Sequence, residues 1–195
     1  MKNMKNESGT TLKETILDAA IALFKEKGST AVKTRDVTDF LGISRSHIYH
    51  YFSDWNTLRI AAFLRFMRMD LDDISARASA LPPEARLSAL IDHYLPESVD
   101  ATWVLYSDIW KYAIHDPILA GMITALIAEW DQLMAQIIRD GIAAGFYKPV
   151  DVPRVARQLG AAVNGYADVL TLHPDPVKRA GVQDDIQELV RVLLQ

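Results

Sequence analysis

The stretch TRDVTDFLGISRSHIYHYF, residues 34–52, decides the fold of the N-terminal part of this 195-residue chain. It reads as two short helices joined by a tight turn at Gly42, which is the pattern of a helix-turn-helix. We expect the first helix to be capped by the Thr34 hydroxyl and the second by Ser44, because both side chains can accept a bond from exposed backbone N–H groups.

The second helix of this pair is expected to have one apolar and one polar face. At about 100° per residue, Ile48 and Phe52 share the face that must pack on neighbouring helices. The opposite face carries Ser46 and His50, with His47 and Tyr49 beside them. Such a surface can read base edges in a major groove and contact phosphates.

Two further positions complete this candidate surface. Arg45, at the helix start, can reach a guanine edge or a phosphate, and the helix N-terminus at Thr34 suits a phosphate oxygen. A solvated helix hairpin without any ligand is the alternative interpretation. The exposed aromatic residues beside two histidines and an arginine favour DNA binding.

Outward from this stretch, the whole chain has helical periodicity. A helix over residues 12–27 carries one apolar stripe, and a helix beginning near Asp54 follows the helix-turn-helix. Proline and aspartate residues such as Pro82, Asp116 and Asp151 mark the later helix ends, and the helix that Asp100 can cap is expected to run to His115. The sequence predicts an all-α protein of about nine helices, with a DNA-binding domain over 1–53 and a ligand-binding and dimerisation domain over 54–195.

Charge is unevenly distributed along the chain, whose net charge is -4. Residues 1–68 hold eleven Lys and Arg against seven Asp and Glu, whereas residues 69–195 hold ten against eighteen. A cationic N-terminal part on an anionic body is typical of a phosphate-facing module attached to another domain, although chance unevenness would look the same.

Several functions lack the residues that they need. The chain has no cysteine, which excludes disulfides and thiolate metal sites. We expect no catalytic residues, no metal site and no cofactor; His93 and His115 are expected to be structural. A small all-α enzyme and a helical adaptor for another protein remain the alternatives. With a polar N-terminus and no apolar run of about 20 residues, the protein is expected to be cytoplasmic and to make no membrane contact.

The sequence over about residues 12–64 resembles the TetR family of bacterial regulators. The resemblance rests on Thr34, Val37, Gly42-Ile43-Ser44, Ile48-Tyr49, Tyr51-Phe52, Ser53-Asp54 and Leu58, and on the preceding helix that ends at Gly28. It implies a homodimeric transcriptional regulator whose first three helices bind a pseudo-palindromic DNA operator. Together with the helix faces, it predicts these DNA-binding residues: Thr34, Arg35, Ser44, Arg45, Ser46, His47, Tyr49, His50 and Tyr51.

The sequence departs from the family pattern at the start of the fourth helix. Trp55 stands where a phosphate-contacting lysine is usual, and Asn56 follows it in place of an acid. Arg59, one turn later, is a candidate replacement for the missing charge. In the second helix, Thr38 and Leu41 replace small residues, so we expect different packing there.

A looser resemblance in the C-terminal part rests on Trp103, Trp110, Ile137-Ile138 through Gly141, Gly145-Phe146, Asp151 and Asn164-Gly165. With these residues the chain resembles the BetI-type regulators of choline and betaine biosynthesis. This resemblance implies a ligand-binding domain and leaves the ligand open. Aromatic residues and a methionine form the predicted ligand site: Trp103, Tyr106, Trp110, Met122, Trp130 and Tyr166. These residues could equally be core. With Asp108 or Asp168 nearby, aromatic faces could receive an organic cation.

The last two helices are predicted to form the homodimer contact. Small residues that permit close approach are Ala156, Gly160, Ala161, Gly165 and Ala167. Apolar area is expected from Val163, Leu170, Ile186, Leu189, Val190 and Leu193. The resemblance implies repression relieved by a small molecule as the default, while activation stays open.

Overall fold

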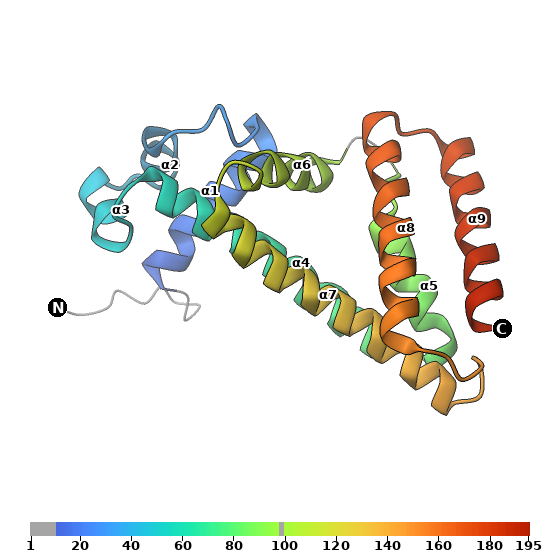
Figure 1. Ribbon diagram of the computed structural model, residues 1–195. Helices are drawn as coiled ribbons and strands as arrows, with labels where there is room; N and C mark the ends of the chain where they lie inside the picture. The colour runs from blue at the N-terminus through green and yellow to red at the C-terminus, as the bar shows by residue number, and fades with distance from the viewer. Residues whose placement is uncertain (1–10, 98–99) are drawn as a thin grey trace. The chain divides into compact units, whose positions relative to one another are not determined.

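All the regular secondary structure of the described residues is helical. The structure is a computed structural model that describes residues 11–97 and 100–195, and within them it contains nine helices and no strand (Figure 1). The expected all-α class is therefore confirmed. The helices are α1 (Leu12–Lys27), α2 (Thr34–Leu41), α3 (Arg45–Tyr51), α4 (Trp55–Ser79), α5 (Pro83–Tyr94), α6 (Ala101–Ala113), α7 (Pro117–Ala143), α8 (Val152–Leu172) and α9 (Pro176–Leu194).

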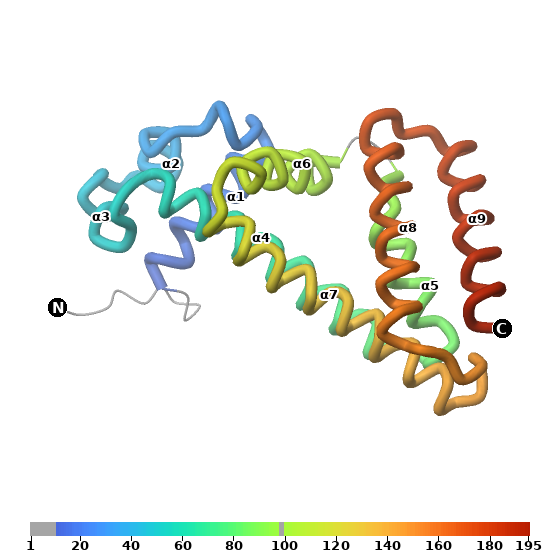
Figure 2. Tube along the Cα trace, viewed as in Figure 1, coloured from blue at the N-terminus to red at the C-terminus, as the bar shows by residue number. Residues whose placement is uncertain are grey.

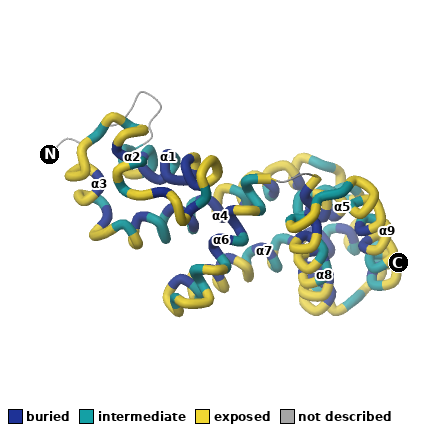
Figure 3. Tube along the Cα trace, turned by 90° about the horizontal axis from the view of Figure 1, so that it is seen from above, coloured by how far each residue is buried: buried dark blue, intermediate teal, exposed yellow. Residues whose placement is uncertain are grey.

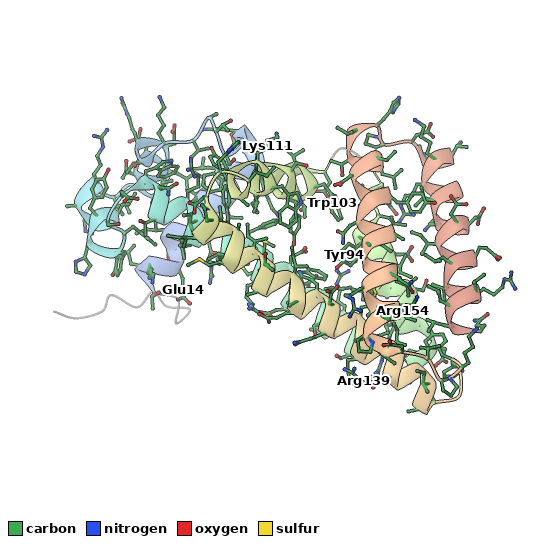
Figure 4. The ribbon with its side chains drawn as sticks, in the orientation of Figure 1. Glu14, Tyr94, Trp103, Lys111, Arg139 and Arg154 are labelled. Atoms are coloured by element: carbon green, nitrogen blue, oxygen red, sulfur yellow. The ribbon has the colours of Figure 1, made fainter. Side chains whose placement is uncertain are left out.

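Polar side chains fix most helix starts where the sequence predicted them. At α1, labelled by Glu14 in Figure 4, the Thr11 hydroxyl accepts the Glu14 N–H and the Glu14 carboxylate accepts the Thr11 N–H. Asp116 accepts the backbone N–H groups of Ile118 and Leu119, both at 3.0 Å. These bonds satisfy N–H groups that have no partner within the helix.

Two helix ends differ from the expectation. Lys33 occupies the N-cap of α2, and its backbone N–H is bonded at 2.8 Å to the Asp36 carboxylate. The predicted cap at Thr34 is therefore wrong, because Thr34 is the first residue of the helix and the Asp36 N–H is bonded to the Lys33 carbonyl at 2.9 Å. Helix α6 ends at Ala113, two residues before the predicted His115.

The helices group into two compact units. Unit 1 comprises the described part of Met1–Met69 together with Val104–Ile123, and unit 2 comprises Asp70–Trp103 and Thr124–Gln195. Helices α4, α6 and α7 contribute to both units. The boundary at residue 53 between a DNA-binding domain and a ligand-binding and dimerisation domain stays a prediction.

Unit 1 is built on the buried face of α1. Ile16, Ala20 and Phe24 are at most 2% exposed, and Ile48 of α3 is fully buried. The Phe24 ring lies 5.5 Å from the Phe63 ring of α4 (centroid to centroid). Figure 3 marks these inward segments as buried. This packing holds α3 in place through its apolar face.

In unit 2, α9 packs beside α8, and α5 packs against α8 (Figure 2). Its core includes Leu90, Leu159 and Val163, each fully buried. Leu170 and Ile186 extend this core along α8 and α9. Burial of such side chains supplies the main stabilisation of a helical bundle.

Helix α7 has the length and apolar composition of a membrane span. An 18-residue window has a mean hydropathy of 1.3, and 33% of that window is buried. Buried Leu119, Ile123, Leu126 and Trp130 recur every three to four residues along it. This stripe is the pattern of a core helix in a folded domain, which passes the same test.

Candidate nucleic-acid interface

Helix α3 presents one face to solvent. Ile48 is 0% exposed and Phe52 is 3% exposed, so these two residues anchor the helix from its inner side. The exposed side chains are Arg45, Ser46, His47, Tyr49 and His50, while Tyr51 is half-buried. The structure thus brings the predicted groove-facing residues together on one short helix. Their contact with DNA stays a prediction.

The start of α3 is a small group of hydrogen-bonding side chains. Ser44 occupies the N-cap, but its Oγ bonds to Ser46 Oγ at 2.6 Å and to His47 Nδ1 at 2.7 Å, and not to the backbone. The position of the cap is therefore as expected, but the expected bond from its hydroxyl to a backbone N–H is wrong, because two neighbouring side chains engage that hydroxyl. At the other end, the His50 and Tyr51 rings meet edge to face with centroids 4.9 Å apart. Both contacts restrict the side chains that would meet a base edge.

Helix α2 contributes the remaining predicted DNA contacts. Thr34 is its first residue and is half-buried. Arg35 forms an exposed ion pair with Asp39, at 3.3 Å between Nε and Oδ2. Such a surface pair contributes about 0–1 kcal/mol, so Arg35 can exchange Asp39 for a phosphate at little cost.

At the start of α4, the residues that depart from the family pattern contact other residues of unit 1. The Trp55 ring meets Phe24 edge to face, with centroids 6.1 Å apart. The Arg59 guanidinium lies 3.8 Å from the centre of the Tyr112 ring and also bonds the Asn56 side chain. Arg59 is therefore engaged within unit 1, and its role as a replacement for the missing lysine stays a prediction.

Thr38, which replaces a small residue of the family pattern, finds its hydrogen-bond partner within α2 itself. Thr38 is 6% exposed, and its hydroxyl donates to the Arg35 carbonyl at 2.8 Å. A buried hydroxyl is tolerated when it has such a partner. The threonine therefore fits without a second polar group from another helix.

A buried carboxylate connects α6 to the loop after α1. Asp108 is 8% exposed, and its Oδ2 accepts the Ser29 N–H at 3.1 Å and the Ser29 hydroxyl at 2.7 Å. Its other oxygen accepts Lys111 Nζ at 3.3 Å (Lys111 is labelled in Figure 4). The expectation that Asp108 awaits an organic cation is therefore wrong, because its charge already has protein partners.

Sequence reasoning missed this connection. Ser29 and Asp108 are 79 residues apart, and neither lies in a motif. Helical periodicity says which side of α6 is apolar, but it carries no information on the loop that a single polar residue meets. Most of α6, from Val104 onward, lies in unit 1 together with α1, α2 and α3.

The predicted ligand residues are divided between the two units. Tyr106, Trp110 and Met122 belong to unit 1, and Trp103, Trp130 and Tyr166 belong to unit 2. The Tyr106 ring packs 5.0 Å from Phe66 and 6.2 Å from Trp110, centroid to centroid. The structure thus brings together Tyr106 and Trp110; their role in ligand binding stays a prediction.

Within unit 2, Trp130 packs between two residues at the end of α5. Its ring stacks on His93 and meets Tyr94 edge to face, with centroids 5.9 and 5.2 Å apart (Tyr94 is labelled in Figure 4). His93 Nε2 lies 3.1 Å from the Asp70 carboxylate, so the imidazole has a partner within the protein, and its structural role stays a prediction. Burial raises the pKa of the Tyr94 hydroxyl, and the negative charges of Asp131 and Asp70 raise it further.

The surface of the last two helices differs in detail from the expected dimer contact. Ala156, Gly160, Val163, Ala167, Leu170 and Ile186 are buried within unit 2, so the interpretation of these residues as dimer surface is wrong. The periodicity that marked them as apolar was that of the unit's own core. Ala161 and Gly165 are exposed, as are four larger apolar residues: Val169, Leu172, Val177 and Val192.

The comparisons with known proteins agree with this architecture. Residues 16–62 match the family model "Bacterial regulatory proteins, tetR family", and residues 83–195 match "BetI-type transcriptional repressor, C-terminal". The second match alone covers more than half of the chain. The chain belongs to the TetR family of DNA-binding transcriptional regulators, with a C-terminal part of the BetI type.

Individual relatives are more distant. The HTH-type transcriptional regulator BetI of Rhizobium meliloti is 30% identical over 103 residues, which cover 49% of this chain and 51% of that protein. The match thus spans about half of that relative's length. The HTH-type transcriptional repressor KstR2 of Rhodococcus jostii is 28% identical over 153 residues, covering 74% of this chain and 72% of that protein.

Solved structures share the fold along nearly the whole chain. A TetR transcription regulator from Haloarcula marismortui has a TM-score of 0.80 at 20% identity, covering 94% of this chain and 98% of its own. A transcriptional regulator from Saccharomonospora viridis, solved in complex with choline, has a TM-score of 0.77 at 19% identity, covering 93% and 96%. At this identity the likeness concerns the fold.

Proposed function

We propose that this protein is a homodimeric repressor that binds a pseudo-palindromic operator through α3 and is released by a small organic molecule. The observation that carries the proposal is the exposed polar face of α3, held from behind by buried Ile48 and Phe52. A short helix of this kind, at the second position of a helix-turn-helix, fits the major groove.

The exposed residues divide into base readers and phosphate contacts. Arg45 has the fork of donors that matches the O6 and N7 acceptors of guanine. Tyr49, 49% exposed, offers a hydroxyl and an apolar ring for a phosphate or a thymine methyl group. Thr34 and Arg35 at the start of α2 are the proposed backbone contacts, and Ser44, Ser46, His47, His50 and Tyr51 complete the surface.

The homodimer is proposed to form through the outer faces of α8 and α9. Leu172 and Val177 are 87% and 81% exposed, and Val169 and Val192 are each 57% exposed. Apolar side chains of this size are stabilised when a second copy removes them from water. Exposed Ala161 and Gly165 on α8 leave room for close helix approach. Two-fold symmetry would then place two copies of α3 on successive major grooves, about 34–36 Å apart.

Release by a ligand requires that it binds one conformation better than the other. A coupling free energy of about 1–3 kcal/mol changes DNA affinity about 5- to 150-fold. An organic cation is the proposed ligand class, on the strength of the aromatic residues of α6 and α7 and of a structural neighbour that binds choline. The connection of α6 to the loop after α1 supports transmission through α6 as well as α4.

The site of action is proposed to be the cytoplasm, because the operator is there. Repression is the proposed sign of regulation, since the C-terminal match and one relative are described as repressors. Activation would require the same DNA contacts and is separated from repression by a reporter gene fused to the operator.

The proposal is tested by selecting bound duplexes from a random pool and measuring affinity for the selected duplex by fluorescence anisotropy. Arg45→Ala should weaken binding by about 1–3 kcal/mol and relax the choice of base at one position, because a bidentate contact is lost. Arg139→Ala is the matched control, since Arg139 lies exposed on α7 in unit 2 (Figure 4).

Light scattering on each variant separates DNA binding from assembly. We expect a dimer for wild type and for both variants, and a steep loss of affinity with salt. Selected duplexes that bind no better than random DNA would overturn the operator. A monomer at micromolar concentration would overturn the homodimer while leaving the helix-turn-helix intact.

A further inference from the structure

A groove of about 570 Å³ runs between α5 and α9 within unit 2. Its floor is apolar, because Leu87 and Ile91 of α5 and Ile186 of α9 line it and are nearly fully buried. The volume is that of a small-molecule site. The predicted aromatic ligand residues do not line this groove, so it is a separate feature of the fold.

A fixed turn closes one end of the groove. Phe146 and Tyr147 line it, and the Phe146 N–H donates to the Gly141 carbonyl at 2.9 Å. Lys148 ties the same turn to α9 through two bonds: its N–H donates to the Leu194 carbonyl at 2.8 Å, and its Nζ donates to Val192 at 3.1 Å. These bonds hold the backbone of the turn beside α9, and Phe146, 46% exposed, lines the groove from there.

Carboxylates stand at both ends of the apolar floor. Glu84 lies in the first turn of α5, while Asp92 lies near its last turn. Asp92 accepts a bond from Gln183 Nε2 of α9 at 2.9 Å, and Asp184, the next residue of α9, also lines the groove. Asp92 stands eight positions after Glu84 in the helix, which is a rise of about 12 Å at 1.5 Å per residue.

These carboxylates differ in how far they are neutralised. Among the residues that line the groove, Arg191 carries the positive charge. Its guanidinium is bonded to the Glu188 carboxylate at 2.5 and 2.8 Å. Asp92 accepts the Gln183 amide and lies 3.9 Å from Arg179. Within residues 11–97 and 100–195, Glu84 and Asp184 have no ion pair. The groove therefore offers one unneutralised carboxylate toward each end.

We propose that this groove binds a linear aliphatic dication, such as a diamine or a polyamine. The two ammonium groups meet Glu84 at one end and Asp184 at the other, and the methylene chain covers Leu87, Ile91 and Ile186. A single cation would satisfy one end, and a neutral chain would satisfy neither. Binding at this groove is independent of the DNA-binding proposal.

The experiment compares three eight-carbon probes on the full-length protein by isothermal titration calorimetry. Diaminooctane carries two charges, octylamine carries one, and octanediol carries none. We expect diaminooctane to bind about fivefold tighter than octylamine and octanediol to bind weakest, because each exposed charge pair adds a modest increment. Equal affinities for diaminooctane and octylamine would overturn the proposal.

Variants locate the two charges. Glu84→Gln and Asp184→Asn should each lower diaminooctane affinity to about the level of octylamine. Asp72→Asn is the matched control, because Asp72 is an exposed acid of unit 2 on α4 that does not line the groove. An equal loss in Asp72→Asn would indicate a general charge effect and would overturn the site.

Amide shifts in NMR spectra supply an independent readout of position. Diaminooctane should shift the signals of Phe146, Tyr147 and Gln183, which border the groove. Shifts centred on Tyr106 and Trp110 of α6 would place the ligand elsewhere and overturn the proposal. The substituted side chains are exposed, so we expect the variants to fold as wild type.

Discussion

Units 1 and 2 differ in how deeply they bury their polar side chains. Unit 1 buries Ser29 and Asp108 almost completely and bonds them to each other. The Arg86–Asp140 ion pair of unit 2, by contrast, keeps 23% and 32% of its side chains exposed. A buried donor that loses its acceptor finds no water, whereas a part-exposed group does. The difference predicts that polar substitutions destabilise unit 1 more than unit 2.

The largest effect is expected from Asp108→Ala. The substitution leaves the Ser29 N–H and hydroxyl buried without an acceptor and should lower the free energy of unfolding by about 2–4 kcal/mol. Urea unfolding followed by tryptophan fluorescence measures this change. Lys111→Met is the control, because Lys111 is 74% exposed and should matter by less than about 0.5 kcal/mol. A loss below about 1 kcal/mol in Asp108→Ala would remove the contrast between the units.

In unit 2, Arg86→Met should cost about 1 kcal/mol. Arg86 donates to the Leu81 carbonyl at 2.9 Å and to Asp140 at 2.8 Å, and both acceptors can recover water after the substitution. The same urea titration is compared with that of Arg191→Met, whose pair with Glu188 is more exposed and should contribute less. A larger effect for Arg86 than for Asp108 would reverse the comparison.

Backbone requirements should be alike in the two units. Gly42 has φ +64° at the turn before α3, and Gly145 has φ +82° at the turn after α7. Alanine at either position should cost about 1 kcal/mol, because its Cβ disfavours positive φ. Gly121→Ala, at an exposed helical position with open space, should instead stabilise by about 0.5–1 kcal/mol. Thermal unfolding gives the sign of each change, and destabilisation by Gly121→Ala would contradict the helical account.

The smallest effect concerns acid pH, where the two units should respond with opposite sign. Hydrogen bonds from the Thr11 backbone and hydroxyl lower the pKa of Glu14, so its stabilising contribution is lost as pH falls through the folded-state value. Burial raises the pKa of Asp131, so that carboxyl favours the folded state at low pH and loses this contribution as pH rises.

Urea unfolding between about pH 3 and pH 6 separates the two responses. Glu14→Gln should reduce the loss of stability toward acid pH, while Asp131→Asn should make that loss steeper. Identical slopes for the two variants would mean that these carboxyls do not distinguish the units.

The helix order and most caps could be predicted because they depend on near neighbours. The apolar stripe of α1, Gly42 at the turn and Asp116 before Pro117 each determine structure within about four residues. The predicted cap at Thr34 was wrong for a local reason, since the helix already begins at Thr34 and Lys33 occupies the N-cap. The candidate DNA surface was predictable because α3 carries it on one continuous segment.

Residues that meet across helices could not be predicted in the same way. Periodicity marked the α8 residues Ala156, Gly160 and Val163 as an apolar face, but it could not say whether that face met α9 and α5 or a second chain. The same limit applied to Asp108, whose partner comes from another part of the sequence.

The amino-acid sequence alone determined the helical class, the exposed face of α3 and the family. Each of these depends on which residue types recur within a few positions of one another along the chain. Only the tertiary structure decided that most of α6 lies in unit 1 with α1, α2 and α3, that Arg59 lies against Tyr112, and that a groove lies between α5 and α9. These features arise from contacts between distant segments, whose free energy depends on packing in three dimensions and not on the period of a single helix.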